Sequence, residues 1–315
     1  MKKKGIKTQY RVRNWSDYNR SLVNRGSLTI WVDEDAIKSW IEHKRSGKRG
    51  APRLYSDVAI LTILVLKSVY HLPFRAAQGF AESIFELMGI ELPVPNYTVT
   101  CRRSKGLQVP GLARKRDEAL HVVIDSSGMK VFGEGEWKVR QHGYSKRRTW
   151  RKLHLGIDEG TGEIVAAVVT TNNVSDCEVI EDLLDQVEGE VSQVSADGAY
   201  DKKGCYQAIR NRGATAAIPP RSGARIWQHG NTKAERLNRD ENLRRCRAVG
   251  RAKWKEESGY HRRSKAENGF FRYKTIIGDK LRSRKFANQA TEMFVGCLVL
   301  NKMTELGMPE SYPVC

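Results

Sequence analysis

The sequence predicts an α/β fold in which a mixed β-sheet core follows a helical N-terminal region. Residues 1–113 carry helix signals, and short β-type runs begin at His121. From there the segments follow the order β-β-β-α-β-α-β, with hairpins first and strand-helix-strand crossovers after them. Such an order gives one mixed sheet with helices on both faces. We expect a helical region over 1–113, an α/β domain over 114–305 and a tail over 306–315.

The N-terminal helices are predicted from their capping residues. Asn14 is expected to cap a helix that ends before Gly26, and Ser56 to cap a buried helix over 57–70. Pro73 stands where the first turn of a further helix tolerates a proline. We therefore expect this region to be helical throughout.

A short basic helix is expected after Pro95-Asn96. It carries Arg102, Arg103 and Lys105. Short helices that end in a basic one are typical of a helix-turn-helix-like module, whose last helix enters the major groove of DNA. A plain helical bundle with solvated arginines is the alternative.

The β segments and the crossover helices are predicted from apolar runs and stop signals. Hairpin strands come first, and two helix-strand units follow them. In order, they are a strand from Val122 to Asp125, strands over 150–157 and 164–170 around the turn Asp158–Gly162, a helix from the capping box Ser175–Glu178 to Val187, a strand over 191–197, a helix capped by Asp201 and stopped by Gly213, and a strand over 214–218.

Two aspartates end strands that this order makes neighbours. Asp125 closes the first strand of the domain, and Asp197 closes the fourth. Side by side, they lie at the carboxyl edge of the sheet, where open α/β sheets place ligands. Taken singly, each is also explained by an Asx turn beside a glycine. Their joint placement favours a shared site.

A third acid, Glu267, lies on a basic helix that runs from Tyr260 to Lys274. At about 100° per residue, Tyr260, Arg263, Glu267 and Lys274 fall within one arc of about 60°. Glu267 stands at the rim of an apolar face that is suited to packing on a sheet. The alternative for a lone acid in such a helix is an i,i+4 pair with Arg263. The apolar face consists of Ala266, Phe270, Tyr273 and Ile277.

The charge of the chain is strongly basic and uneven. It has 55 Lys and Arg against 36 Asp and Glu, a formal net charge of +19. Residues 1–53 carry 14 basic and 5 acidic side chains, and residues 219–274 carry 16 and 6. Such a field attracts polyanions, so nucleic acid is the first partner to expect. A membrane is not expected, because the best apolar run, Val58 to Val69, is short and interrupted by Lys67.

The six cysteines form no C-x-x-C pair and no Cys/His cluster, so neither a zinc site nor a disulfide framework is predicted. The Lys-rich start has no apolar segment behind it, unlike a signal peptide. We expect reduced thiols in a cytoplasmic, nucleoid-associated protein.

The three acids indicate metal-dependent phosphoryl chemistry. Neighbouring carboxylates raise one another's pKa unless a cation neutralises them. Hard oxygen ligands suit Mg²⁺, with Mn²⁺ as a substitute. Two such ions about 3.5 to 4 Å apart stabilise both the entering and the leaving oxygen of an in-line displacement. Asp125, Asp197 and Glu267 thus predict a two-ion site for phosphodiester cleavage or transfer.

These motifs resemble those of a bacterial insertion-sequence DDE transposase, and the chain is most similar to insertion-sequence family five. Tyr260, Arg263, Glu267 and Lys274 match the Tyr-x2-Arg-x3-Glu-x6-Lys signature of related elements at every spacing. The segments Ile-Asp125-Ser-Ser-Gly and Ala-Asp197-Gly-Ala-Tyr-Asp match the boxes of the first two acids. The likeness extends over nearly the whole chain.

The resemblance implies an RNase H-like catalytic core in the α/β domain. Metal-activated water would cut the 3′ end of each transferred strand, and the freed 3′-hydroxyl would attack target DNA. Tyr260, Arg263 and Lys274 are implied to hold phosphates of the transposon end. Double-stranded DNA is the implied partner, bound by a homodimer or a larger synaptic complex. Some relatives carry a β insertion before the Glu helix, but residues 219–258 are too few and too charged for one.

Two basic stretches remain. Six basic residues around Trp254 are expected to clamp DNA phosphates, with Trp254 stacked on an unpaired base, and a solvated loop is the alternative. Trp137 to Lys152 is either a basic hairpin that touches DNA or plain surface. His154 is expected to be packed or hydrogen-bonded rather than a ligand. The six basic residues are Arg244, Arg245, Arg247, Arg251, Lys253 and Lys255.

Three functions are compatible with these features. The first is an active transposase that cleaves and transfers DNA strands. The second is a catalytically silent, transposase-derived DNA-binding protein or repressor. The third is an RNase H-like nuclease that cuts DNA and never joins it to a target.

Overall fold

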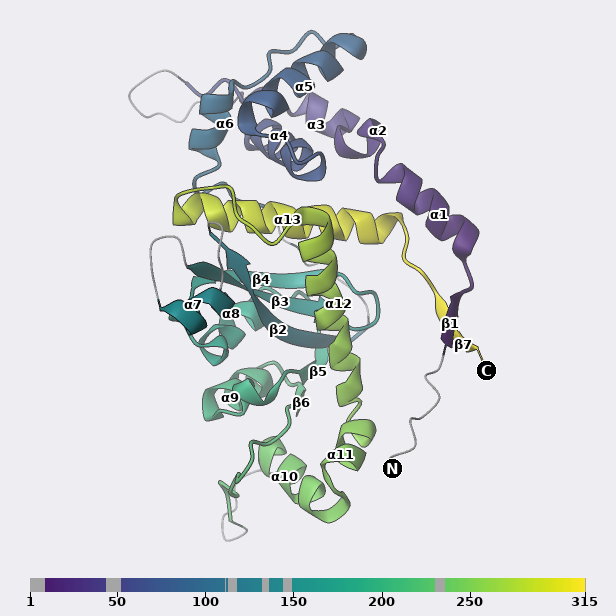
Figure 1. Cartoon of the computed structure of the whole chain (residues 1–315), viewed down its shortest axis with the longest axis vertical. Helices are drawn as coiled ribbons and strands as arrows, with labels where there is room; N and C mark the ends of the chain where they lie inside the picture. Colours follow the sequence, from purple (N-terminus) through teal and green to yellow (C-terminus); the bar gives the residue numbers. More distant parts are fainter. Residues whose placement is uncertain are drawn as a thin grey trace.

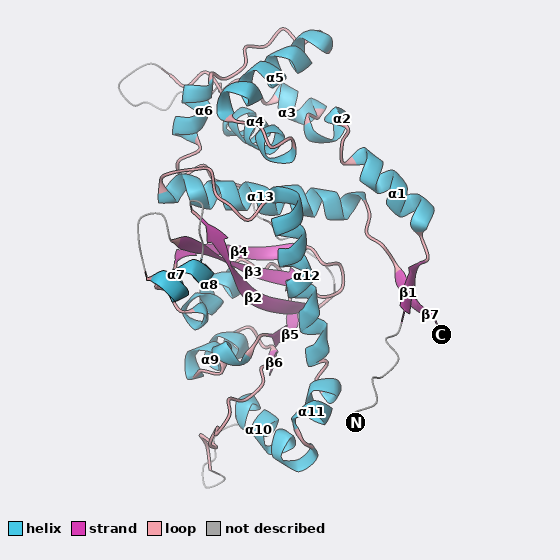
Figure 2. Ribbon diagram, in the orientation of Figure 1, coloured by secondary structure: helices cyan, strands magenta, loops and turns pink. Residues whose placement is uncertain are grey.

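A mixed five-stranded sheet forms the centre of the molecule (Figure 2). The computed structural model describes residues 9–43, 52–110, 112, 118–131, 136–143, 149–229 and 236–314. The strand order is β4-β3-β2-β5-β6, with β3 antiparallel to β2 and β4, and β5 parallel to β2 and β6. This confirms the predicted mixed sheet with its first and fourth strands as neighbours. The strands are β2 (Leu120–Lys130), β3 (Trp150–Asp158), β4 (Ile164–Thr171), β5 (Val191–Ser195) and β6 (Thr215–Ala217).

Helices cover both faces of this sheet, because the side chains of β2 alternate between two apolar cores. Val122 and Ile124 belong to the core with α8 and α9. Val123 belongs to the core with α12 and α13, and Asp125 is the next residue on that same face. These helices are α8 (Ile180–Asp185), α9 (Lys203–Asn211), α12 (Ser264–Arg272) and α13 (Phe286–Leu306).

β2 does not end at Asp125, as the sequence predicted. It continues to Lys130 because β3 pairs with β2 along most of its length. The parallel pairing with β5, by contrast, stops at Val123 and Ser195. Asp125 therefore lies within its strand, whereas Asp197 follows the end of the neighbouring strand.

α13 is a long helix for which the sequence analysis made no prediction. Met293 and Cys297 lie in the core beneath the sheet, while Val295 and Val299 lie in the core of the N-terminal helices. Because both sides of α13 are buried, it has no amphipathic stripe to reveal it. Figure 1 shows α13 between the sheet and α4, so one helix joins the two regions.

A glycine in α13 leaves room for the ring of Tyr273, which begins the π-helical segment η4 (Tyr273–Ile277). A Cβ added at Gly296 would meet Tyr273 Oη at 2.5 Å. Tyr273 is buried and donates its hydroxyl to the Met293 carbonyl at 3.3 Å. We expect Gly296→Ala to lower the free energy of unfolding by about 2 kcal/mol, because overpacking outweighs the better helix propensity of alanine.

Urea unfolding measures this effect. The matched control is Gly79→Ala in α5, where an added Cβ meets nothing within 4 Å. That variant should be neutral or stabilised. If Gly296→Ala were as stable as Gly79→Ala, the close packing of Tyr273 against α13 would be wrong.

The N-terminal region is helical, as predicted, and packs over α13 (Figure 1). Ser56 accepts the Ala59 amide at 3.1 Å, and Asn96 accepts the Thr98 amide at 2.9 Å, so both residues cap helices. The helices are α1 (Trp15–Asn24), α2 (Leu28–Trp31), α3 (Glu34–Lys38), α4 (Asp57–Val69), α5 (Phe74–Leu87) and α6 (Tyr97–Arg103).

A small antiparallel ribbon joins β1 (Gln9–Val12) to β7 (Ser311–Val314) (Figure 1). The predicted tail is therefore partly a strand. Asn14 does not cap α1 through its side chain, contrary to prediction. The side chain instead donates to the Met308 carbonyl at 3.0 Å and accepts the Glu310 amide at 2.8 Å. Asn14 thus links the start of α1 to the segment that follows α13.

The basic stretch before α12 is a helical hairpin rather than a solvated loop. It consists of α10 (Asn238–Val249) and α11 (Arg251–Glu257). The Ala216 amide donates to Asn238 Oδ1 at 2.9 Å, and Asn242 Nδ2 donates to the Ala216 carbonyl at 2.7 Å. Two side chains of α10 thereby satisfy the outer edge of β6, which would otherwise be open for pairing.

One local prediction is wrong: Asp201 does not cap α9, because its carboxylate pairs with the buried Arg239 at 3.1 Å. For Trp137–Lys152, a basic hairpin and plain surface were the alternatives, and its described residues up to 142 belong to a helix, α7 (Glu136–His142), rather than to a hairpin. Residues 144–148 of that segment lie outside the described residues.

His154 is fully buried and shares a 2.9 Å hydrogen bond with Thr170 Oγ1, which confirms the prediction of a packed histidine. Burial lowers the pKa of His154 to about 4. The cysteines of the described chain are free. Within the described residues no single helix is long and apolar enough to cross a membrane, and α4 with α5 meets that criterion only as a pair bent by 108°.

Candidate active site

The parallel pairing of β2 and β5 brings the two predicted aspartates to the same place. Val123 pairs with Ser195, and Asp125 and Asp197 each lie two residues further along. Because side chains alternate along a strand, the Asp125 side chain projects from the same face of the sheet as Val123, the face that α12 covers. The charge of Asp197 acts on Asp125 there, as expected of close neighbours.

Each aspartate also organises the backbone beside it. Asp125 Oδ1 accepts the Ser126 amide at 2.9 Å, and Asp197 Oδ1 accepts the Ala199 amide at 2.8 Å. Asp197 thereby caps the short 3₁₀ turn η2 (Gly198–Tyr200). The structural role foreseen for these residues is real. These backbone hydrogen bonds orient both carboxylates. The structural interpretation and the shared-site interpretation are therefore compatible.

α12 carries Glu267 over β2 and β3. The helix approaches the sheet closely at Gly269, where an added Cβ would meet Ile157 Cδ1 at 2.3 Å. Glu267 stays exposed at the rim of the buried face. That buried face includes Ala266, Phe270 and Tyr273, as predicted.

Arg263 connects two of the three acids. It ends the 3₁₀ segment η3 (Tyr260–Arg263), which leads into α12. Its Nη1 donates to Asp125 Oδ2 at 2.9 Å, and its Nη2 donates to Glu267 Oε1. The i,i+4 pair with Glu267 therefore exists, and the same guanidinium also reaches the sheet.

The surroundings of Asp125 oppose its ionisation. Burial raises the pKa of the Asp125 carboxyl above its ordinary value, and the nearby charges of Asp197 and Glu267 raise it further. The Ser126 amide and Arg263 lower the same pKa without cancelling these effects. The Asp125 carboxyl is thus under the influence of both other acids, Asp197 and Glu267.

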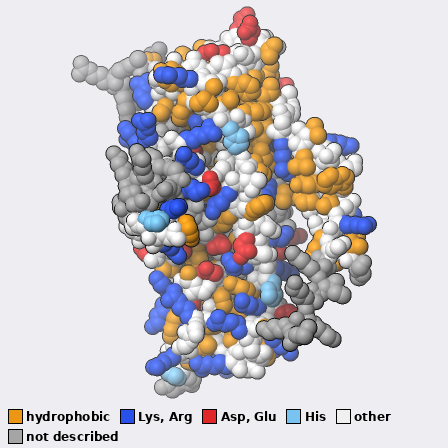
Figure 3. All heavy atoms as spheres, viewed as in Figure 1, with side chains coloured by type: hydrophobic (Ala, Val, Ile, Leu, Met, Phe, Trp, Pro, Cys, Tyr) orange, Lys and Arg blue, Asp and Glu red, His pale blue; other side chains and the backbone are white. Residues whose placement is uncertain are grey.

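Tyr260 and Lys274 lie on either side of α12, in the 3₁₀ segment η3 and the π-helical segment η4, so the single regular helix predicted from Tyr260 to Lys274 is not formed. Lys274 Nζ donates to Ser127 Oγ at 2.6 Å. The Ser127 side chain projects from the same face of β2 as that of Asp125. The ring of Tyr260 lies 5.8 Å from the Arg263 guanidinium. In Figure 3, acidic side chains gather near the middle of the viewed face, with basic side chains above and below them.

The donor set fits a divalent cation in its chemistry. Asp125, Asp197 and Glu267 offer the hard oxygens that Mg²⁺ prefers. As placed, the described residues include no group of three His, Cys, Asp or Glu side chains that holds a metal ion. Arg263 instead provides the positive charge between Asp125 and Glu267. Metal binding by all three acids therefore requires Arg263 to leave Asp125.

The predicted DNA-binding residues of the N-terminal region differ in accessibility. Arg102 and Lys105 are exposed at the end of α6. Arg103 is engaged with the Asp57 carboxylate and the Tyr55 carbonyl. Only the first two side chains are free to meet a phosphate in this conformation.

Trp254 is buried, so its predicted stacking on an unpaired base is wrong for this conformation. Its side chain is only 2% exposed, and its indole donates to Asn242 Oδ1 at 3.3 Å. Its ring lies 6.0 Å from the ring of Tyr260. Trp254 therefore positions Tyr260, because α11 packs beneath η3.

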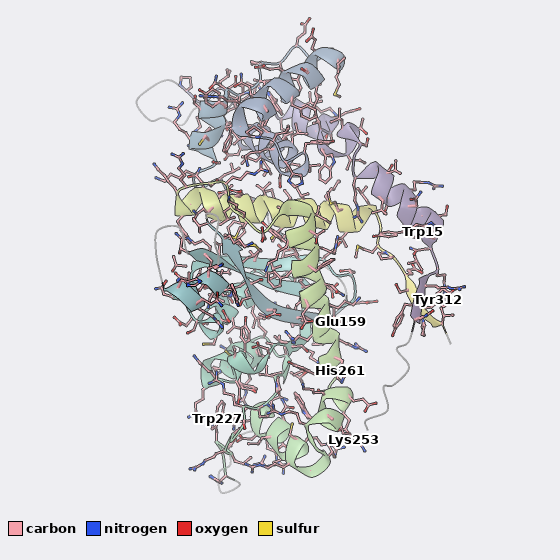
Figure 4. All side chains as sticks on the ribbon, viewed as in Figure 1. Trp15, Glu159, Trp227, Lys253, His261 and Tyr312 are labelled. Atoms are coloured by element: carbon pink, nitrogen blue, oxygen red, sulfur yellow. The ribbon has the colours of Figure 1, made fainter. Side chains whose placement is uncertain are left out.

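Two neighbours of the site, Ser127 and Glu159, were not predicted from the sequence. Ser127 stands two residues after Asp125, so strand periodicity alone would have placed it on the same face. Glu159, in the turn after β3, pairs with Arg262 at 3.3 Å and lies beside α12 near His261 (Figure 4). No local signal predicts this second contact, because the partners are far apart in the chain.

Arg263→Ala should destabilise the fold by about 1 to 2 kcal/mol near neutral pH, because ionised Asp125 loses its charged partner. The folded state already raises the pKa of Asp125, and removal of Arg263 raises it further. Arg263→Ala therefore destabilises the protein fully at pH values above that pKa, where Asp125 is ionised. The destabilisation disappears in acid, where Asp125 is protonated. Urea unfolding at about pH 7 and about pH 4 measures both values.

The matched control is Arg262→Ala, which removes the neighbouring exposed arginine and its pair with Glu159. It should cost little at either pH. An Arg263→Ala loss that was the same in acid as at neutral pH would contradict the role assigned to Asp125.

Two family models match the chain, both described as a transposase DDE domain. They cover residues 23–134 and 116–302. A cryo-EM structure of a piggyBac transposase synaptic complex with hairpin DNA is similar over 90% of this chain and 73% of that chain, at 10% identity. Its TM-score of 0.39 is too low to support an argument. The second family model spans more than half of the chain and includes all three acids, so the chain belongs to the DDE transposase family.

Proposed function

We propose that this protein is an active insertion-sequence transposase, closest to insertion-sequence family five. It binds the terminal inverted repeats of its element in the cytoplasm, cuts DNA strands at those ends and joins them to target DNA. The observation that carries this proposal is that Arg263 bonds both Asp125 and Glu267, while the charges of Asp197 and Glu267 both act on Asp125. A strongly basic chain around an acidic centre suits a polyanion that must be held and then cut.

The three acids would hold two Mg²⁺ ions, for which Mn²⁺ would substitute. When bound, such ions generate a water nucleophile and stabilise the leaving oxygen. The protein contributes the orientation of the ligands. The Ser126 and Ala199 amides fix the Asp125 and Asp197 carboxylates, and Gly269 sets the height of Glu267 above the sheet.

The signature bases would hold phosphates of the element's end. A guanidinium bonds a carboxylate or a phosphate with similar two-pronged geometry. A DNA-end phosphate therefore competes with Asp125 for Arg263. Once Arg263 turns to DNA, the oxygens of Asp125 become available as ligands. Lys274 and Tyr260 lie on either side of α12 and would contact neighbouring phosphates.

The strand order supports an RNase H-like core, because an antiparallel meander is continued by two parallel strands. Since both ends of an element must be cut, we propose a homodimer or a larger synaptic complex on DNA. Arg102 and Lys105 remain our proposed contacts to DNA in the N-terminal region.

The test uses a labelled duplex that carries the inverted repeat found beside the reading frame. The full chain is incubated with this duplex, a supercoiled target plasmid and Mg²⁺ or Mn²⁺. We expect a new 3′-hydroxyl at the element boundary, followed by labelled DNA joined to the plasmid.

The two alternatives give different products. Binding of the duplex without any cut would indicate a silent DNA-binding protein or repressor. Cut ends that never join the plasmid would indicate a nuclease. The intact set of three acids is the reason that we favour the active transposase over the silent form.

A further inference from the structure

A pocket lies at the corner between α4 and α5, opposite the segment that joins η4 to α13. Its cavity volume is about 50 Å³, and it is open to solvent. None of the three acids or of the signature bases lines it. Its charged and titratable lining consists of Lys67, His71, Lys280, Arg282 and Glu292. Three permanent cations therefore share the pocket with one carboxylate.

Lys67 is the buried member of this lining. Its side chain is only 9% exposed, in the last turn of α4. Its ammonium lies 5.0 Å from the ring centre of Phe74 and has no hydrogen bond or ion pair to any residue in the described part of the chain. Burying an ammonium without an acceptor is costly. Burial lowers the pKa of Lys67 accordingly, and a bound anion would offset this cost.

The N-terminus of α5 opens on the same pocket. α5 has 14 residues, and its N-cap, Pro73, provides no side-chain cap. The first amides of a helix lack intrahelical partners, and they favour anions. Phe74, the first residue of α5, lines the pocket beside Lys67. The pocket thus combines a buried ammonium with the first residue of an uncapped helix.

Hydrogen bonds connect the α4–α5 corner and α13 to the segment around Arg282. His71 has φ +54°, a conformation that is uncommon for a residue other than glycine. Its carbonyl accepts Arg282 Nη1 at 2.7 Å. The Glu292 carboxylate accepts the amides of Arg282 and Ser283, each at 2.9 Å. Glu292 is held by backbone donors and makes no ion pair with Lys67, and although its charge favours the ammonium, burial still lowers the pKa of Lys67.

We propose that this pocket binds one phosphate group, which during the reaction is a backbone phosphate of the bound DNA. Lys67, Arg282 and the α5 N-terminus provide its donors. The pocket wall is hydrogen-bonded to the end of β2, the strand that carries Asp125. The Lys130 amide donates to the Asp279 carbonyl at 2.8 Å, and the Leu281 amide donates to the Lys130 carbonyl at 2.7 Å. The assignment to DNA rests on the proposed function, whereas the affinity for phosphate does not.

The test compares the full-length protein with Lys67→Met. Methionine fills the same apolar space without a buried charge, so the variant should fold at least as stably. Thermal unfolding is followed in sodium phosphate and in sodium chloride of equal ionic strength. We expect phosphate to raise the unfolding temperature of the wild type by mass action and to have no such specific effect on Lys67→Met.

A second measurement follows the affinity for a short duplex of arbitrary sequence as salt is varied. The slope of log K against log salt is negative, and its magnitude should be smaller by about 0.9 in Lys67→Met, as for one lost phosphate contact. Lys38→Met is the matched control, because Lys38 is exposed on α3 beside Glu34. It should behave as the wild type in both measurements.

An equal response of the wild type and Lys67→Met to phosphate would overturn the proposal. A lost phosphate response with an unchanged DNA slope would support a phosphate site but assign it to free phosphate, which overturns the DNA source alone. Failure of strand cleavage in the wild type would bear on the proposed function only, since the phosphate measurement does not depend on it.

Discussion

Replacing Asp125 by asparagine should reduce strand cleavage at the element's end by roughly 10³-fold or more, because a ligand essential to the metal site loses its charge. Asp197→Asn and Glu267→Gln should have effects of the same order. The amide is nearly the same size as the acid, so the fold is retained. Single-turnover cleavage of a labelled duplex measures the rate, and a gel-shift titration measures DNA binding, which should persist in all three variants.

Asp185→Asn provides the control for charge alone. Asp185 is exposed at the end of α8, on the opposite face of the sheet, and its substitution should leave cleavage unchanged. Wild-type cleavage by any one of the three active-site variants would remove that residue from the proposed site.

The largest effect on stability is expected from Arg239→Met. Arg239 is 3% exposed and pairs with Asp201 and Asp240, each at 3.1 Å. Its guanidinium also lies 3.9 Å from the ring centre of Trp227, which Figure 4 shows near α10. Without Arg239, two buried carboxylates lose their common partner. We expect a loss of about 3 to 5 kcal/mol in the free energy of unfolding, measured by urea titration.

Arg244→Met on the same helix separates this effect from the simple loss of a charge. Arg244 pairs with Glu241 at 2.6 Å, but both side chains are 43% exposed, so solvent screens the pair. Its substitution should change stability by no more than about 0.5 kcal/mol. Similar losses in the two variants would mean that the Asp201–Arg239–Asp240 cluster does not hold α10 to the core.

The candidate site was largely predictable because its geometry follows from local periods. Alternation along a strand fixes the face of Asp125, and the i,i+4 spacing places Arg263 beside Glu267, although the helix is not regular as far as Lys274. The order of strands and helices then makes β2 and β5 neighbours. These rules depend only on residues near one another in sequence and on a small set of allowed topologies.

The rest depends on contacts between distant residues. α13 is buried on two sides, so its apolar pattern has no single face to recognise. Asn14 contacts Met308 and Glu310, nearly 300 residues away, in place of its own helix. Trp254 is buried because α11 folds back under Tyr260. In each case the position of the residue depends on tertiary packing, which the local sequence does not reveal.

The most direct test of the account is a metal rescue at Asp197. If this carboxylate is a metal ligand, Asp197→Cys should lose cleavage in Mg²⁺, because a thiolate is a poor ligand for a hard cation, and should regain part of it in Mn²⁺ or Cd²⁺. Asp197→Asn should regain cleavage in none of these ions. Full activity of Asp197→Cys in Mg²⁺, or a loss that no thiol-accepting metal repairs, would contradict the central claim that the three acids form one metal-dependent active site.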